Sequence, residues 1–165
     1  METPMQYKVR ILGLMKGKDP VAVQRETSSQ LAGLLSGVSA VKLSTRPTPD
    51  KWSVGEIMAH LAEAEITSTW RYRQMLEHDG CSLPGFGQEL WARLGDYASR
   101  EPEDSLQLFR LLRETNLSMF DRLTAEEWQR HGVHTERGEM TVRDLAVQIA
   151  GHDINHIEQI RAILK

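Results

Sequence analysis

The chain has 165 residues, of which 40% are hydrophobic and 26% charged, and its formal net charge is −3. That composition is typical of a globular protein, and the length is enough for one domain with a sizeable core. A single cysteine excludes a disulfide framework and a cysteine-based zinc site. No basic run suggests a nucleic-acid groove, and no apolar run approaches the roughly 18–20 residues that a membrane span needs.

The N-terminal segment bears on where the protein resides. It has a brief apolar patch, but it lacks the apolar core and the small-residue cleavage site of a signal peptide. Because Cys81 has no cysteine to pair with, we expect a cytoplasmic location, where thiols stay reduced. No repeat, low-complexity stretch or long linker divides the chain, so we also expect a single domain over residues 1–165.

Two long helices are predicted in the first half of the chain. Asp19-Pro20 is an N-cap followed by proline at the first helical position, and it begins a helix that continues to about Leu35. The segment STRPTPDKW is expected to be a loop, because its two prolines prevent a helix from continuing there. Ser53-Val54-Gly55-Glu56 is a capping box that opens a second helix running to about His78.

The second half of the chain predicts two more long helices. The stretch HDGCSLPGFGQ breaks the second helix, and a short helix is expected near residues 89–94. A third long helix is expected over about 102–123, followed by a short capped turn from Thr124. HGVHTERGE is expected to be a loop, and Thr141 caps a fourth helix reaching Ile163. With no alternating runs typical of strands, the sequence predicts an all-α four-helix bundle with short extra helices in the loops.

Two histidines near the end of the chain lie four residues apart, in HDINHIEQI. The apolar stripe of the fourth helix continues through His152 and His156, so both should face the core. Side chains four apart on a helix have Cβ atoms about 5–6 Å apart, so two imidazoles can converge on one ion at about 2.0–2.1 Å from each nitrogen. For this pair alone, hydrogen-bonded core histidines are the alternative interpretation.

A third histidine strengthens the metal hypothesis. His60 lies between Ile57 and Ala64 on the core-facing stripe of the second helix, so it too should turn inward. Burial of three imidazoles without partners is costly, and a divalent ion would satisfy their nitrogens. One histidine from one helix and two from another match the needs of a three-ligand metal site.

At these residues the sequence resembles a known family. The stretch RPTPDKWSVGEIMAHLAEAE (residues 46–65), combined with GHDINHIEQI (residues 151–160), is similar to the DinB/YfiT superfamily of helical metalloproteins. The resemblance implies an up-down-down-up type of four-helix bundle. It also implies that His60, His152 and His156 bind a divalent metal ion, commonly zinc or nickel.

The resemblance implies a range of activities. The family includes S-transferases that use a low-molecular-weight thiol such as bacillithiol or mycothiol, and a group that isomerises maleylpyruvate. For this chain it implies a small-molecule substrate, a low-molecular-weight thiol as a candidate cosubstrate and a homodimer as a candidate assembly. Neither nucleic acid nor a membrane is an expected partner.

Three neutral histidine ligands would leave the ion its full positive charge and a position open to water or substrate. Such an ion lowers the pKa of bound water toward roughly 7, and it equally favours a bound thiolate. The leading hypothesis is therefore a metal-dependent enzyme acting as a small-thiol S-transferase or a hydrolase. The alternatives are a non-catalytic metal-binding stress protein and an ordinary bundle with hydrogen-bonded core histidines.

Two residues beside the histidines are predicted to be catalytic. Glu63, one turn after His60, is a candidate general base or an acceptor for the free N–H of a ligating imidazole. The alternative for it is a solvated helix glutamate. Gln159 adjoins the histidine pair and is the second candidate.

Several other side chains have roles that the sequence leaves open. Asn116 falls on the apolar stripe of the third helix and could face the site, and Asp153 adjoins the histidine pair. Arg71, on the core side of the second helix, could bind a carboxylate or another anionic group, with an interhelical salt bridge as the alternative. We expect Trp52 to be a packing anchor and His134 to be structural or solvent-facing.

Overall fold

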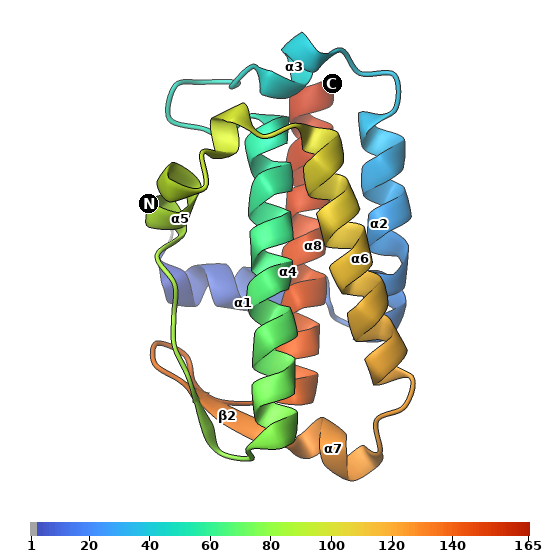
Figure 1. The fold of residues 1–165 in the computed structure, drawn as a ribbon, viewed down its shortest axis with the longest axis vertical. Coiled ribbons are helices and arrows are strands. Elements are labelled where there is room, and N and C mark those ends of the chain that lie inside the picture. The colour runs from blue at the N-terminus through green and yellow to red at the C-terminus, as the bar shows by residue number, and fades with distance from the viewer. Residues whose placement is uncertain (1–2) are drawn as a thin grey trace.

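The computed structural model describes residues 3–165. Its centre is a bundle of four long helices, α2 (Pro20–Leu35), α4 (Val54–Glu77), α6 (Pro102–Phe120) and α8 (Val142–Leu164). Helices α2 and α8 run in one direction and α4 and α6 run in the other (Figure 1), which confirms the expected up-down-down-up order. No helix of the described part of the chain is both long and apolar enough to cross a membrane.

The predicted caps begin the predicted helices. The Asp19 side chain accepts a hydrogen bond from a backbone N–H of the first turn of α2. Ser53 and Thr141 form reciprocal capping boxes with Glu56 and Asp144 at the starts of α4 and α8. These side chains satisfy N–H groups that a helix leaves unbonded at its N-terminus, so the sequence locates the helix starts well.

Shorter elements connect the long helices. They are α1 (Pro4–Leu14), α3 (Ala40–Ser44), α5 (Gln88–Leu94), the 3-10 helix η1 (Tyr97–Ser99) and α7 (Ala125–Gln129). The sequence predicted α5 and α7 but not α1, α3 or η1. Figure 1 shows α1, α5 and β2 on one side of α4 and α8, while α2 and α6 lie on the other.

Helix α1 packs unusually closely against α8. A Cβ atom at Gly151 would lie 2.3 Å from the backbone oxygen of Ile11, so no larger residue fits there without a backbone shift. This glycine immediately precedes His152. The close approach therefore places α1 directly beside the histidine pair.

A small three-stranded sheet corrects the expectation that strands are missing. Its strands are β1 (Cys81–Leu83), β2 (His131–His134) and β3 (Gly138–Thr141), in the order β1-β2-β3. β1 pairs with β2 in parallel and β2 with β3 antiparallel, so HGVHTERGE is mostly a hairpin rather than an irregular loop. Strands of three or four residues are too short for alternation to mark them.

The bundle core divides into two apolar clusters. One surrounds Ile57 and Phe109 near α3, and the other surrounds Tyr72 and Phe120 near the sheet. Along α4 and α8, the residues between these clusters include several buried polar side chains. The candidate site belongs to this polar middle section of the bundle.

Candidate metal centre

Three histidines from two helices meet inside the bundle, as the sequence predicted. His60 comes from α4, and His152 and His156 come from α8 one turn apart. One ring nitrogen of each lies within 4.8 Å of the others, and Nε2 of His60 lies 3.0 Å from Nε2 of His152. The ring centroids are 4.4–5.1 Å apart. The two helices thus bring together side chains that are more than ninety residues apart in the sequence.

The arrangement fits a divalent ion. Zinc–imidazole bonds of about 2.0–2.1 Å allow two ligand nitrogens on one ion to lie at most about 4 Å apart. Nε2 of His60 and Nε2 of His152 already lie within that limit, at 3.0 Å. Among the described residues, no carboxylate forms an ion pair with any of the three imidazoles, so the donor set is neutral nitrogen. That set suits zinc, nickel, copper and iron alike.

The surroundings keep these imidazoles neutral. Burial, reinforced by the charge of His156, lowers the pKa of His60 to about 3. Burial also lowers the pKa of His156 to about 4, although its hydrogen bond to Gln159 acts in the opposite direction. Burial and the two other histidines lower the pKa of His152 well below its usual value. Because metal binding requires unprotonated nitrogen, the site is prepared for a cation at neutral pH.

Gln159, a predicted catalytic residue, orients one of the histidines. Its Oε1 lies 2.9 Å from Nδ1 of His156. Because a glutamine Oε1 can only accept, Nδ1 carries the hydrogen and Nε2 is left free to ligate. This is the type of contact by which an outer residue sets the tautomer of a metal-binding imidazole.

Aromatic rings pack against the histidine cluster next to His60. The Trp52 ring lies 5.1 Å from that of His60, and the Tyr97 ring packs against Trp52 at 5.9 Å. Trp52 also packs against the apolar cluster near α3, as its predicted role of packing anchor requires. In addition it lines a pocket, a role that the sequence analysis did not assign to it.

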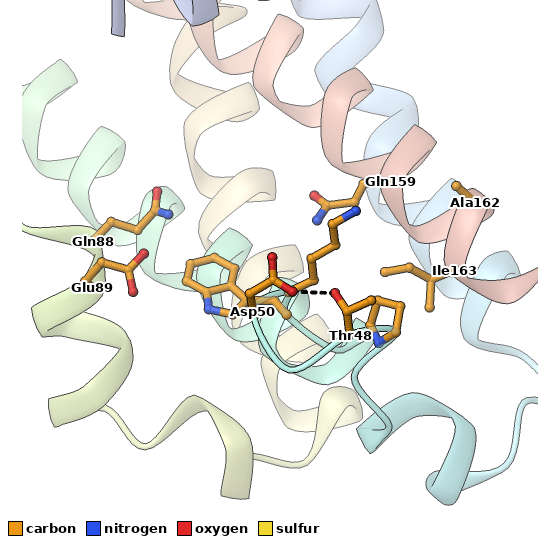
Figure 2. A pocket seen from close by; sticks show the side chains of 10 residues that line it. Thr48, Asp50, Gln88, Glu89, Gln159, Ala162 and Ile163 are labelled. Atoms are coloured by element: carbon orange, nitrogen blue, oxygen red, sulfur yellow. Dashed lines mark hydrogen bonds between the residues drawn. The ribbon is translucent and has the colours of Figure 1, made fainter. Parts of the chain in front are cut away.

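A pocket of about 500 Å³ opens next to the histidine cluster. Trp52 and Gln159, which contact His60 and His156, both line it. Figure 2 shows Gln88 and Glu89 on one side of this pocket and Gln159 on the other. The proline-rich loop before α4 completes the wall, although the sequence marked that segment only as a loop.

Glu63, the other predicted catalytic residue, lies one turn after His60 on α4 and is bound to another side chain. Its Oε1 accepts a hydrogen bond of 2.6 Å from Nη2 of Arg100. The Glu63 side chain is 14% exposed, so the interpretation as a fully solvated glutamate does not apply. The negative charge of Glu63 also contributes to a raised pKa of Tyr97, after burial as the main cause. Its role as a general base stays a prediction.

Asn116 and Asp153 belong to a separate cluster on the side of α2 and α6. Arg113 on α6 donates to Asp153 at 2.6 Å and to Glu65 at 2.8–2.9 Å, and the side chains of all three are 1% exposed. Asn116 donates to Glu65 at 2.8 Å, and Thr27 donates to Asp153 at 2.9 Å. The sequence did not reveal the ion pair between Arg113 and Glu65. The two residues lie on different helices, so no spacing within one helix identifies them as partners.

Among the described residues, Arg71 does not form the interhelical salt bridge considered for it. Its Nη2 donates to the backbone oxygen of Pro84 at 2.7 Å, and its guanidinium lies 5.9 Å from the centre of the Phe86 ring. His134 is buried on β2, so of the two alternatives predicted for it, structural or solvent-facing, the solvent-facing one is wrong. Both side chains lie on the face of the bundle that carries the sheet.

Comparison with known proteins places this site in a family. The model of the DinB superfamily matches residues 25–160. The chain belongs to the DinB superfamily. A protein of Oceanobacillus iheyensis is 24% identical over 137 residues, which cover 83% of this chain and 79% of that protein. YfiT from Bacillus subtilis is 22% identical over 160 residues, which cover 94% and 90% of the two chains. Both relatives carry the name "putative metal-dependent hydrolase".

The solved structure of YfiT from Bacillus subtilis confirms the DinB-type fold. It superposes with a TM-score of 0.82 at 19% sequence identity, and the match covers 98% of this chain and 87% of that one. Its title describes an unusual four-helix bundle topology and a "probable metal-dependent hydrolase". At this identity the likeness concerns the fold, and the chemistry of this chain has to be argued from its own residues.

Proposed function

We propose that this protein is a metal-dependent enzyme, a hydrolase or a small-thiol S-transferase, in which His60, His152 and His156 hold a divalent ion, zinc or nickel. The observation that carries the proposal is the convergence of three neutral imidazole nitrogens within 4.8 Å, with no carboxylate among their ion-pair partners in the described chain. The names of the relatives support a metal-dependent reaction of the hydrolase class. When bound, the ion supplies a Lewis acid that polarises a substrate and lowers the pKa of a coordinated water or thiol.

The protein's own residues position and enclose this chemistry. Gln159 fixes the His156 ring through Nδ1, and Trp52 packs against the His60 ring. The pocket of about 500 Å³ beside them is large enough for a small-molecule substrate. We assign Glu63 as the proton acceptor, held by Arg100 one turn from His60. A low-molecular-weight thiol as cosubstrate, a homodimer and a cytoplasmic location are further parts of the proposal.

Metal analysis tests the proposed site directly. Protein purified without a histidine tag should contain about one divalent ion per chain, and His156→Ala should abolish this content. His78→Ala is the matched control: the His78 side chain is exposed to solvent, so its removal should leave the metal content unchanged. A His156→Ala protein that folds and retains its metal would refute the assignment.

Activity measurements separate the enzyme from a metal-binding protein without catalysis. The metal-loaded protein should turn over members of a panel of hydrolysable esters and amides, or of electrophiles offered with thiols. Glu63→Gln should lower the turnover number by about 10²-fold or more while metal content is unchanged, which is the usual contribution of a general base. Cobalt-substituted protein adds an independent measurement, since four protein ligands in its spectrum would favour a structural ion.

A further inference from the structure

Two buried hydrogen-bond donors on the sheet-bearing face have no acceptor in the part of the chain that the structure describes. Arg71 is 5% exposed and His134 is 2% exposed. Nε of Arg71 and Nε2 of His134 form no hydrogen bond with any described residue. Nδ1 of His134 accepts a hydrogen bond from the backbone N–H of Glu136 at 3.1 Å, so the hydrogen of the neutral ring lies on Nε2. Both unsatisfied atoms therefore carry hydrogens to donate.

Positive charge gathers around these donors and extends toward the histidine cluster. Arg137 donates to Oε1 of Gln148 at 3.1 Å, one turn before His152 on α8. After burial, the charges of Arg71 and Arg137 are the main causes that lower the pKa of His134. Arg137 also contributes to the lowered pKa of His152. Arg137 thus connects the turn between β2 and β3 to α8, one turn before His152.

Little negative charge balances this group. Glu136 is the acidic residue whose charge acts on both Arg71 and His134. Its carboxylate lies against Gly85, and among the described residues it forms no ion pair with Arg71. Burial and the charge of Arg137 accordingly lower the pKa of Arg71 to about 10. A buried arginine without a carboxylate destabilises the fold, because no attraction to an opposite charge offsets the free energy lost when the guanidinium leaves water.

The contrast with Arg113 shows what Arg71 lacks. Arg113 is also buried, and two carboxylates accept from it. Arg71 has one backbone carbonyl and one aromatic ring as neighbours. An anionic oxygen that accepts from Nε of Arg71 and from Nε2 of His134 would satisfy both donors and neutralise the charge.

We propose that Arg71 and His134 bind an anionic oxygen group, of the carboxylate type, on the substrate whose reacting end lies at the three histidines. The substrate class is therefore a small molecule with a metal-directed group at one end and a carboxylate at the other. This inference rests on the proposed function, since it assumes an ion at His60, His152 and His156.

Bifunctional probes test the inference on the zinc-loaded full chain. The probes are the monohydroxamates of malonic, succinic and glutaric acids, which carry a metal-binding hydroxamate and a carboxylate at increasing separation. Each is paired with its neutral monoamide of the same length, and acetohydroxamate reports the metal alone. At one length, the carboxylate probe should bind about tenfold or more tightly than its amide, the increment expected of a charge-assisted hydrogen bond.

Variants then locate the source of the preference. Arg71→Met should reduce the ratio of the two affinities to about one, and His134→Phe should reduce it in part, while acetohydroxamate binding is unchanged. Arg73→Met is the matched control, because Arg73 lies two residues further on α4, is exposed, and should leave the ratio intact. If Arg71→Met does not fold, the wild-type comparison of acid and amide at three lengths still decides the question.

Each failure has its own signature. If acetohydroxamate binds but no carboxylate probe exceeds its amide by more than about twofold, the anion site is refuted and the metal centre stands. If the preference survives in both Arg71→Met and His134→Phe, another group binds the carboxylate and the assignment is wrong. If the protein takes up no zinc and binds no hydroxamate, the proposed function fails and the inference falls with it.

Discussion

Helices α4 and α8 each contribute to two buried polar clusters that are built in opposite ways. In the ion cluster, defined as Arg113, Glu65 and Asp153, each charged group has an oppositely charged partner within 2.6–2.9 Å. In the histidine cluster, Nδ1 of His60 has no hydrogen-bond partner among the described residues, and its Nε2 lies at hydrogen-bond distance, 3.0 Å, from Nε2 of His152. The two clusters are adjacent, because His152 and Asp153 are consecutive residues.

The difference indicates which polar cluster is structural and which receives a ligand. Buried polar groups normally have hydrogen-bond partners within the protein, so a buried group without one suggests a bound ligand or ion. The ion cluster needs no ligand, since the guanidinium from α6 forms ion pairs with one carboxylate from α4 and one from α8. The histidine cluster brings three ring nitrogens together without an opposite charge, an arrangement that a bound cation would complete. Four predictions test this contrast, beginning with the largest expected change in free energy.

Acid should destabilise the metal-free protein through the histidine cluster. The folded pKa values of His60 and His156 are about 3 and about 4, whereas an unfolded histidine has its ordinary value of about 6.5. Between these values the unfolded chain binds more protons, so stability is fully present above about pH 6.5 and is lost as the pH falls toward 4. Each imidazole adds up to about 1.4 kcal/mol per pH unit to this slope of the free energy of unfolding.

Urea denaturation between pH 7 and pH 4.5 measures this slope. The variant His156→Leu removes one titrating group and should make the slope shallower by up to about 1.4 kcal/mol per pH unit. His78→Leu, at an exposed position, should leave it unchanged. A wild-type stability that is flat over this range would show that the imidazoles are not buried in their neutral form.

Loss of the central guanidinium should break the ion cluster. Arg113→Met leaves Glu65 and Asp153 buried without a counter-charge, and we expect the free energy of unfolding to fall by about 3–5 kcal/mol. Arg110→Met is the control on the same helix: its ion pair with Glu114 is more than half exposed, and removing it should cost about 1 kcal/mol or less. Equal effects of the two variants in urea denaturation would contradict the contrast.

The sequence predicted the histidine cluster better than the ion cluster for a physical reason. His60, His152 and His156 lie on apolar stripes, so the spacing within one helix already shows that they turn inward. Arg113 and Glu65 lie on different helices, and no spacing within either helix reveals that the two meet. The same limit explains why the sequence left the role of Asn116 open, whereas the structure shows that it bonds to Glu65.

Helix boundaries followed from local chemistry, whereas the covering segments did not. Ser53 and Thr141 begin helices through contacts with residues three positions later, which a sequence shows directly. The contacts of Arg71 are with Pro84 and Phe86, in the segment after β1, and β1 pairs with β2 across about fifty residues. Which segments cover a helix face depends on such distant pairing, so the surroundings of Arg71 required the structure.

The hydrogen bond between Gln159 and His156 should raise the affinity of the histidine cluster for metal. Gln159→Leu removes the acceptor that holds Nδ1 of His156, and we expect zinc affinity to fall by about 10–100-fold, the usual cost of losing such a contact. Zinc titration against a competing chelator measures this loss. Gln148→Leu, also on α8 but bonded to Arg137, is the control and should change zinc affinity much less. Unchanged zinc affinity in Gln159→Leu would remove Gln159 from the site.

The smallest effect is expected from the ion pair between Glu63 and Arg100, which is partly open to solvent. The Glu63 side chain is 14% exposed and that of Arg100 is 32% exposed, so this pair is intermediate between the ion cluster and a surface pair. A double-mutant cycle with Glu63→Gln and Arg100→Met should give a coupling free energy of about 0.5–1 kcal/mol, because solvent screens the attraction. Urea denaturation of the four proteins measures it. A coupling of about 3 kcal/mol or more would mean that Glu63 serves chiefly to hold α4 to the segment around η1. Its carboxylate would then be a structural group like those of Glu65 and Asp153, rather than the proton acceptor of the histidine cluster.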